Sequence, residues 1–368
     1  MIKLSLPDIL FLLVLGLHGA LHGLGAVQGF GWATLRGMRH RIGWRGGLLW
    51  LLAGLLFLLA AVLYGVGWEG WWGVAAGGVI LSQGVIFAAW KDARAGTVLN
   101  LLIAVVVVLS AGLFFFERGY RRDRAFLHEA IQSASDSTSL VTEDDLRPLP
   151  PTVQQYLRYA GVVGRPTVRA MTAVMRGEMR ERTGRRFPFV ARQESRFDQP
   201  ARLFWMEGHM FGVTVPGYHR YLDGRASMEV RLFGMIPVVS PAGGVLDRAE
   251  TVTHFTDMCL MAPATLIDRR ISWKILDPTR VEATFDSGPH QVRAVLTFAP
   301  DGRLVNFTSN DRTAVDVMRT LPFSTPLGAY RDFGPYRLAG RGEAVWEYPE
   351  GPFSYATIEI EQIRYSLP

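Results

Sequence analysis

The chain has 368 residues, of which 49% are hydrophobic, and its formal net charge is +6. This length and apolar content exclude one ordinary soluble domain, and the single cysteine, Cys259, excludes an internal disulfide framework and a cysteine metal cluster. The charge excess lies entirely in residues 1–124, where it flanks hydrophobic runs, so it indicates membrane connectors and argues against nucleic acid as a partner.

Four apolar runs contain no charged side chain and are each long enough to cross a bilayer. They are Ile9–Phe30, Leu48–Val66, Trp72–Trp90 and Val98–Phe116. Most of the tryptophans fall at or near the ends of these runs, as expected at membrane–water interfaces. The first run is longer than a signal-peptide core, so we expect a retained anchor. The sequence therefore predicts a four-helix transmembrane domain over residues 1–122.

Two histidines, His18 and His22, lie near mid-depth of the first span and share one helix face. Polar side chains at that depth need partners, and the later spans offer Ser82, Gln83, Thr97 and Asn100. Hydrogen bonds between the helices are the favoured interpretation. A site for a quinone-like headgroup and a metal or haem site are the alternatives. We predict no metal and no cofactor, because spans two to four contain no His, Cys, Met, Asp or Glu.

Two further features of the membrane part are candidate interaction sites. Gly19 and Gly23 let another helix approach closely, which favours packing within the chain and alternatively supports a homodimer. Lys91 and Asp92 lie in the third connector at the membrane edge. An ion pair with headgroup contact is the favoured interpretation there, and capture of a substrate is the alternative.

Basic residues beside the spans indicate their orientation. One side carries Arg36, Arg39, Arg41, Arg45, Lys91 and Arg94, and the other carries Lys3, Arg118, Arg121, Arg122 and Arg124. Short loops weigh more in the positive-inside rule than a segment that leads into a large domain. We therefore expect both chain ends outside the cytoplasm, in a multi-pass protein of the cytoplasmic (inner) membrane with an extracytoplasmic C-terminal domain.

After the last span the pattern changes twice. Residues 123–144 combine a helical extension with the small polar run Ser133–Ser139, which is typical of a linker. The stretch "LPPTVQQYLRYAG" then predicts a short helix with proline at its start and Gly161 at its end. A globular domain is predicted over residues 145–368.

From Pro166 onward the hydrophobic period falls to two residues. "MTAVMRGEMR", "SMEVRLF" and "QVRAVLTF" alternate apolar and polar side chains, as half-buried antiparallel strands do. Turn signals such as Asp223-Gly224 and Pro300-Asp301-Gly302 separate neighbouring runs. We expect a curved antiparallel meander of about ten strands. A helical stripe within residues 246–267 predicts a helix that covers one face of this sheet.

Such a sheet either packs solid or leaves a cavity under the covering helix, and the pattern leaves both open. Its inward positions are rich in methionine, which is common at adaptable apolar binding surfaces. Trp205, Glu207 and His209 share one strand face, where a carboxylate beside an imidazole suits acid–base chemistry; exposed edge residues are the alternative. We predict no catalytic residue, because the sequence has no nucleophile motif, phosphate loop or metal-ligand spacing.

Five segments together resemble an uncharacterised family of bacterial membrane proteins. They are "LHGALHGLG", "LSQGVIFAAWKDARAGTVLNLL", "LPPTVQQYLRYAGVVGRP", "YLDGRASMEVRLFGMIPVV" and "YRDFGPYRLAGRGEAVWEYPEGPFSY". The resemblance covers nearly the whole chain and implies four N-terminal spans and a β-rich C-terminal domain, without an activity. The β domain is also similar to the half-barrel of periplasmic lipoprotein carriers, which hold acyl chains. "HGALHGLG" is similar to the first helix of DoxX-type membrane proteins, which are associated with oxidoreductases.

The predicted fold class is an α-helical membrane bundle of four spans plus an α+β domain, dominated by a curved antiparallel β meander with covering helices. Two classes of function follow. The favoured one is non-catalytic binding of a lipid, another apolar ligand or a protein partner by the β domain, because its apolar strand faces are abundant. The alternative is an oxidoreductase-like membrane enzyme or accessory subunit that uses His18 and His22. The lipid bilayer is an expected partner in both.

Overall fold

A computed structural model describes residues 4–34, 41–132, 139–210 and 212–366. The predicted orientation residues Lys3, Arg36 and Arg39, and residues 133–138 of the predicted linker, lie outside these described residues. The chain divides into two compact units. The first comprises Met1–Glu117 with Phe233–Met235, and the second comprises Arg118–Leu232 with Ile236–Pro368.

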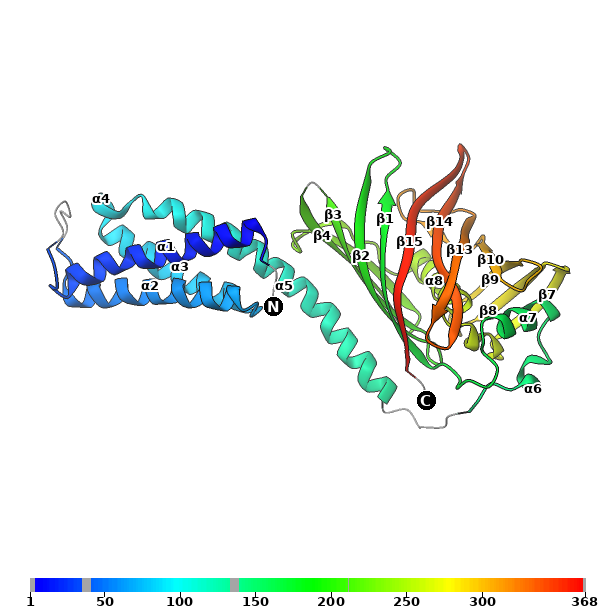
Figure 1. The fold of residues 1–368 in the computed structure, drawn as a ribbon. Coiled ribbons are helices and arrows are strands. Elements are labelled where there is room, and N and C mark those ends of the chain that lie inside the picture. Colours follow the sequence, from blue (N-terminus) through cyan, green and yellow to red (C-terminus); the bar gives the residue numbers. More distant parts are fainter. Residues whose placement is uncertain (1–3, 35–40, 133–138, 211, 367–368) are drawn as a thin grey trace. The chain divides into compact units, whose positions relative to one another are not determined.

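Four helices are long and apolar enough to cross a membrane, so the predicted spans are confirmed as helices (Figure 1). They are α1 (Leu6–Gly29), α2 (Trp44–Gly65), α3 (Trp71–Ala88) and α5 (Gly96–Gln132). A short helix, α4 (Trp90–Ala93), lies between the last two. The predicted helical extension is also present, because α5 continues well past Phe116.

Local signals in the sequence explain where α1 begins and how it meets α2. Ser5 caps the helix through a capping box with Asp8, whose carboxylate accepts a hydrogen bond of 2.8 Å from the Ser5 backbone N–H. Asp8 also accepts a hydrogen bond of 2.5 Å from the hydroxyl of Tyr64 on α2. Most large apolar side chains of α1, such as Leu13 and Leu17, point outward, as expected in a lipid environment.

Glycines set the close approach of α1 and α2. A Cβ atom added to Gly19 would lie 3.0 Å from the carbonyl oxygen of Gly54, so the two backbones nearly touch there. A Cβ atom on Gly23 would meet nothing within 4 Å. Gly19 therefore packs within the chain, and the homodimer through this glycine pair stays a prediction.

The second unit is built on one antiparallel sheet of 13 strands. Its order is β6-β5-β4-β3-β2-β1-β15-β14-β13-β10-β9-β8-β7, and a separate pair joins β11 to β12. The bounds are β1 (Ala170–Arg180), β2 (Arg186–Arg196), β3 (Ala201–Met210), β4 (Val213–Leu222), β5 (Arg225–Leu232), β6 (Ile236–Val239), β7 (Ile271–Asp277), β8 (Arg280–Asp286), β9 (Gln291–Phe298), β10 (Leu304–Ser309), β11 (Thr313–Ala314), β12 (Arg319–Thr320), β13 (Phe323–Phe333), β14 (Tyr336–Tyr348) and β15 (Gly351–Ser366).

The sheet is curved and open, because the edge strands β6 and β7 do not pair with each other. The predicted curved antiparallel sheet is confirmed, but the described residues form more strands than the ten or so expected. The extra strands are short, such as β6, β11 and β12, and too brief to show a period of two. The last strand, β15, lies between β1 and β14. Its pairing with β1 joins the first and the last strand of the sheet in chain order.

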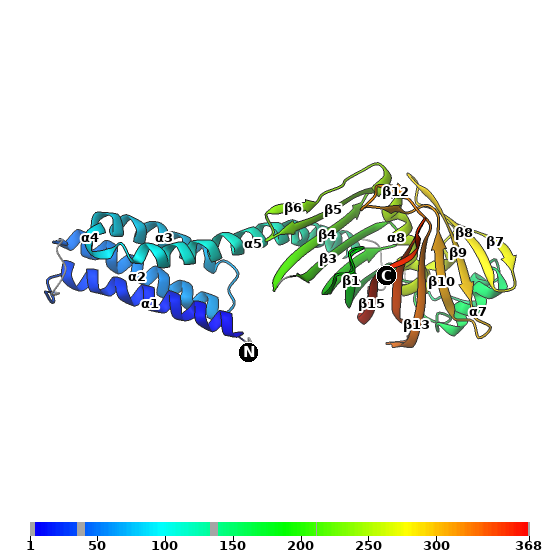
Figure 2. The ribbon, with the colours of Figure 1, turned by 90° about the horizontal axis from the view of Figure 1, so that it is seen from above.

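Helix α8 (Val245–Met261), followed by the 3₁₀ turn Pro263–Ile267, lies inside the curve of the sheet (Figure 2), as the helical stripe predicted. The ring of Phe255 stacks on that of Phe285 from β8 at 5.2 Å. Two further helices are α6 (Glu143–Leu146) and the predicted α7 (Pro151–Tyr159). Tyr156 of α7 donates a hydrogen bond of 2.8 Å to the carbonyl of Cys259, so both ends of the domain contribute to one core.

Candidate functional site

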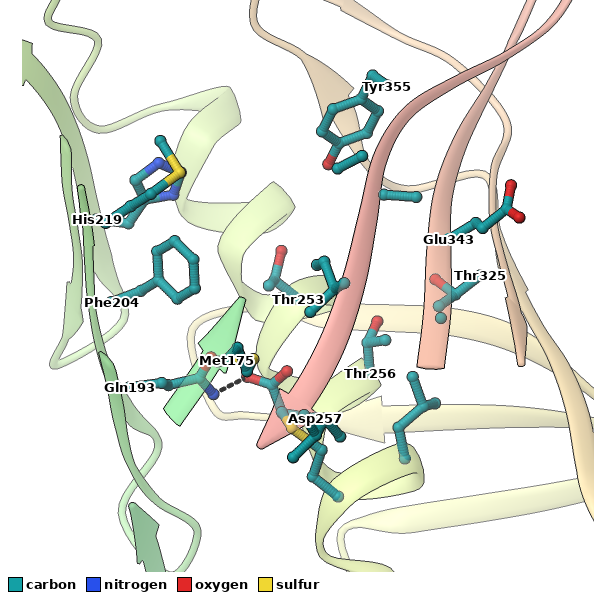
Figure 3. Close-up of a pocket in the computed structure, with 18 of the residues that line it drawn as sticks. Met175, Gln193, Phe204, His219, Thr253, Thr256, Asp257, Thr325, Glu343 and Tyr355 are labelled. Carbon is teal, nitrogen blue, oxygen red and sulfur yellow. Dashed lines mark hydrogen bonds between the residues drawn. The ribbon is translucent and has the colours of Figure 1, made fainter. Parts of the chain in front are cut away.

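A cavity of about 180 Å³ lies between α8 and the sheet (Figure 3). Its lining is mainly apolar and includes Met175, Met179, Phe189, Phe204, Met206 and Met261. The sequence left open whether the meander packs solid, and the structure resolves this in favour of a cavity. Methionine is unbranched and flexible, so a wall with four methionines adapts to ligands of different shape.

Buried charges lie at one side of this cavity. Arg202 of β3 donates from Nε to Asp257 Oδ2 at 2.8 Å and from Nη1 to Glu250 Oε2 at 3.3 Å, and both carboxylates come from α8. Its Nη2 donates to Gln193 Oε1 of β2 at 3.0 Å, and Gln193 Nε2 donates to Asp257 at 2.7 Å (Figure 3). These side chains are all at most 8% exposed. The network fixes α8 to β2 and β3. Each of the three nitrogens of the Arg202 guanidinium donates a hydrogen bond to another side chain of the protein.

The two carboxylates respond differently to their surroundings. Burial opposes ionisation of Glu250, but the imidazole of His219 and the guanidinium of Arg202 outweigh it and lower the pKa of Glu250 to about 2. For Asp257, burial outweighs the favourable contacts with Arg202 and Gln193, so its pKa is raised. Glu250 is therefore the firmly ionised partner of Arg202 at neutral pH.

A third polar residue of α8, His254, lies in an apolar setting. Its side chain is fully buried, and neither ring nitrogen has a hydrogen-bond partner in the part of the chain that the structure describes. The rings of Phe197, Tyr221 and Phe285 surround it. Burial lowers the pKa of His254 to about 3, and the positive charges of Arg202 and Arg270 act in the same direction. The negative charge of Glu250 opposes this shift only in part. A neutral imidazole here is a core side chain.

The reactive side chains in and near the lining are buried, and two of its carboxylates are paired. The thiol of Cys259 is buried and its pKa is raised, first by desolvation and then by Asp257, so it is not activated as a nucleophile. No group of three or more His, Cys, Asp or Glu among the described residues could hold a metal ion. The carboxylates that line the cavity beside Arg202 are already hydrogen-bonded to it.

The predicted residues Trp205, Glu207 and His209 lie on the other face of β3. Phe204 and Met206, which alternate with them, line the cavity. Trp205 donates a hydrogen bond of 3.0 Å to Glu207, which also accepts one of 3.2 Å from Arg192. A ligand on that face stays a prediction. The methionines of the lining, such as Met175 and Met206, occupy the inward positions that the alternation predicted, whereas the polar lining residues Gln193, Arg202 and Arg312 were missed because their partners come from distant segments.

The structure brings together four of the predicted membrane residues. His18 Nε2 donates to Asn100 Oδ1 at 2.8 Å, and Asn100 Nδ2 donates to Gln83 Oε1 at 3.0 Å. His22 Nδ1 donates to the carbonyl of His18 at 2.8 Å, and its Nε2 lies 2.8 Å from the hydroxyl of Ser82. The two rings therefore have partners on α3 and α5, in the way that the favoured interpretation requires. Binding of a ligand by this cluster stays a prediction.

Lys91 and Asp92, the last two predicted residues, lie on the short helix α4, within the connector between α3 and α5. Lys91 is exposed and Asp92 is half-buried. They lie apart in the sequence from the polar cluster of His18 and His22, and their role in binding stays a prediction.

Replacing Asn100 with alanine is expected to destabilise the helical bundle by about 1–2 kcal/mol, because it removes partners from His18, Ser82 and Gln83 in an apolar interior. Thermal unfolding of the purified protein in detergent measures the loss. Leu101→Ala changes an exposed side chain next to it and should have little effect. Equal stability of the two variants would contradict a structural role for the network.

Comparison with known proteins decides the family. A family model described as a family of unknown function (DUF6544) matches residues 139–358, which is more than half of the chain. The chain belongs to the DUF6544 family. The expected membership of a family without an assigned function is thereby confirmed. No curated protein matches this DUF6544 chain.

Solved structures resemble the second unit at low sequence identity. One is a domain from Vibrio parahaemolyticus that carries a provisional assignment as an outer membrane lipoprotein-sorting protein, with 9% identity, a TM-score of 0.33, and coverage of 54% of the DUF6544 chain and 85% of that chain. Another is a DUF1329 family protein from Desulfovibrio piger, with 12% identity, a TM-score of 0.34, and coverage of 58% and 92% respectively.

Proposed function

We propose that this DUF6544 protein is a multi-pass membrane protein whose β-rich unit binds a lipid or another apolar ligand without converting it. The cavity between α8 and the sheet carries this proposal, because its lining is rich in methionines and aromatic side chains. The four apolar helices would anchor the chain in the cytoplasmic (inner) membrane. The charge distribution supports an extracytoplasmic position of the β-rich unit.

The size of the cavity limits what enters it. An engineered apolar cavity of roughly 150 Å³ holds benzene, so about 180 Å³ suits a ring or a segment of an alkyl chain. A whole lipid would need more space. Rearrangement of the methionines or exposure of the remaining chain to solvent would provide it.

The alternative, redox chemistry at His18 and His22, has less support. Each ring already hydrogen-bonds to a neighbouring helix, and spans two to four provide no further residue of a type that binds a metal. The two rings also lie on one helix face, with centroids 4.7 Å apart, so they cannot occupy opposite sides of one haem iron.

Filling the cavity tests the proposal. Ala356 of β15 lines it and is buried, so Ala356→Phe should occupy the space and reduce ligand labelling at least about tenfold. The probe is a hexadecanol with a diazirine in its chain, added to the full-length protein in phosphatidylcholine nanodiscs. After irradiation, mass spectrometry measures the label on peptides that contain Met175, Met206 or Met261.

Thr357→Phe is the matched control, because Thr357 is the next residue of the same strand and does not line the cavity. It should leave the labelling of these peptides unchanged. Label confined to the membrane helices of the wild-type protein, or equal label in both variants, would reject binding in the cavity.

A further inference from the structure

A second arginine of the cavity, Arg312, differs from Arg202 in its surroundings. It lies on the connection between β10 and β11 and contributes to the cavity wall. The backbone around it is held firmly: Asp311 accepts hydrogen bonds from Arg248 of α8 at 2.7 Å and from the Arg293 backbone N–H at 2.8 Å. The carbonyl of Arg312 itself accepts a hydrogen bond of 3.1 Å from Leu321. The backbone at Arg312 is therefore held in place by the fold.

Aromatic rings brace the guanidinium of Arg312. Its central carbon lies 4.0 Å from the ring centroid of Phe323 and 5.4 Å from that of Trp346. Stacking on rings satisfies the faces of a guanidinium and leaves the N–H groups at its edges available. In the described part of the chain, no carboxylate lies within ion-pair distance of Arg312. The protein thus supplies the rings, and the charge of Arg312 acts on Glu250 from beyond ion-pair distance.

An unused hydroxyl lies on the strand that carries Phe323. Thr325 lines the cavity, is 9% exposed, and its Oγ1 has no hydrogen-bond partner among the described residues (Figure 3). A buried hydroxyl without a partner carries a free-energy cost, which a bound acceptor would remove. Because Thr325 follows Phe323 by two residues on β13, the two side chains share one strand face.

The α8 side of the cavity has the opposite character. The hydroxyls of Thr253 and Thr256 donate to the carbonyls of Ala249 and Val252, at 3.1 and 2.8 Å, so they offer only lone pairs. Glu250 adds a negative charge, and each of the three nitrogens of the Arg202 guanidinium already donates a hydrogen bond. Glu343 of β14 also lines the cavity, and its carboxylate accepts a hydrogen bond of 3.0 Å from Ser354. An anionic group is disfavoured near either carboxylate and favoured at the edge of the Arg312 guanidinium.

We infer that the ligand of this cavity is a single-chain amphiphile with an anionic group, a carboxylate or a phosphate, which Arg312 binds while the alkyl chain lies among the methionines. The inference rests on the proposed function and adds the chemical class of the ligand. An isolated guanidinium at an apolar wall is costly to desolvate without a partner, and a carboxylate or phosphate oxygen matches its planar donors.

Two chain-matched probes test the inference: a hexadecanoate and a hexadecanol with the same diazirine, added to the full-length protein in phosphatidylcholine nanodiscs at about pH 8.5, where the carboxylate is ionised. We expect the carboxylate to label the cavity peptides at least about tenfold more efficiently than the alcohol. Arg312→Gln should remove this preference, so that the two probes label the cavity peptides equally. Arg312→Lys should retain part of it, because the charge remains.

Controls separate the possible outcomes. Arg319→Gln removes an exposed arginine of β12 that does not line the cavity, and it should keep the preference. If hexadecyl phosphate competes with the carboxylate probe and inorganic phosphate does not, the anion is bound as the headgroup of an amphiphile. If only inorganic phosphate competes with this probe, the ligand is not an amphiphile. Equal labelling by both probes, or an unchanged preference in Arg312→Gln, would overturn the role of Arg312 and leave apolar binding intact. Absence of label from both probes would reject the proposed function itself.

Discussion

Replacement of Arg202 with methionine is expected to lower the free energy of unfolding of the β-rich unit by roughly 3–5 kcal/mol. The variant keeps much of the side-chain volume but leaves Glu250 and Asp257 buried without their cation. It also removes the hydrogen bond to Gln193, so α8 loses its polar connection to β3, while Gln193 of β2 can still donate to Asp257. Urea unfolding of the full-length protein in detergent, followed by the circular dichroism of its β structure, measures the change.

Two controls show whether uncompensated charge causes this loss. Arg303→Met breaks an ion pair of 2.7 Å with Asp301 on the surface, where both side chains are more than 40% exposed, and should cost less than about 1 kcal/mol. Adding Glu250→Gln and Asp257→Asn to Arg202→Met should recover part of the lost stability, because the buried charges disappear together. If the triple variant were less stable than Arg202→Met, packing rather than charge would explain the effect.

Acid is expected to destabilise the β-rich unit through His254. The pKa of His254 falls from about 6.5 in the unfolded chain to about 3 in the folded protein, because burial disfavours the imidazolium. Between these values the unfolded state binds a proton that the folded state does not. The stability is therefore complete above about pH 6.5 and declines as the pH falls towards 3. Between pH 7 and 4.5 the loss from this residue is roughly 2–3 kcal/mol.

His254→Phe isolates this contribution. Phenylalanine fits among the rings of Phe197, Tyr221 and Phe285 and cannot bind a proton, so the variant should lose about 2–3 kcal/mol less than the wild type on acidification. The stability that Glu250 contributes is lost only below its ordinary pKa of 4.5. Glu250 and Asp257 are present in both proteins, so their contributions cancel when the pH dependence of His254→Phe is subtracted from that of the wild type. Phe197→Leu, which perturbs the same core without a titratable group, should be less stable by the same amount at both pH values. Identical pH dependence in wild type and His254→Phe would exclude His254 as the cause.

The sequence predicted the elements well where the signal is local. Charge-free runs of about 20 residues identify membrane-length helices without reference to other parts of the chain. Proline and glycine mark the ends of α7, and alternation within a strand identifies strands such as β9. The interhelical partners of His18 and His22 were also predictable, because few polar residues occur in the other spans.

Pairings between distant segments were not predictable from these patterns. The hydrogen bonds between β1 and β15 join residues near the two ends of the β-rich unit, and hydropathy carries no information on which strands become neighbours. The network of Arg202, Gln193, Glu250 and Asp257 depends on the same long-range arrangement. One signal did exist in the sequence. Glu250 and Asp257 lie seven residues apart, two helical turns, beside the apolar stripe of α8, and buried carboxylates at that spacing need partners on the sheet.

The candidate residues on β3 show the limit of such patterns. Trp205, Glu207 and His209 form the more conspicuous set, yet the neighbouring Phe204 and Met206 reach the cavity. Arg312 has no distinguishing neighbour in the sequence. Its rings come from β13 and β14, which follow it in the chain and approach it only through folding.

Cys259 gives the chain an internal reporter. It is the one cysteine in the sequence, and it sits fully buried on α8, where Tyr156 holds its carbonyl. A maleimide can reach its sulfur only after the helix has lifted from the sheet, so the alkylation rate of the unmodified protein counts these local openings. Entry of a ligand beneath α8 can thus be followed over time without introducing another cysteine.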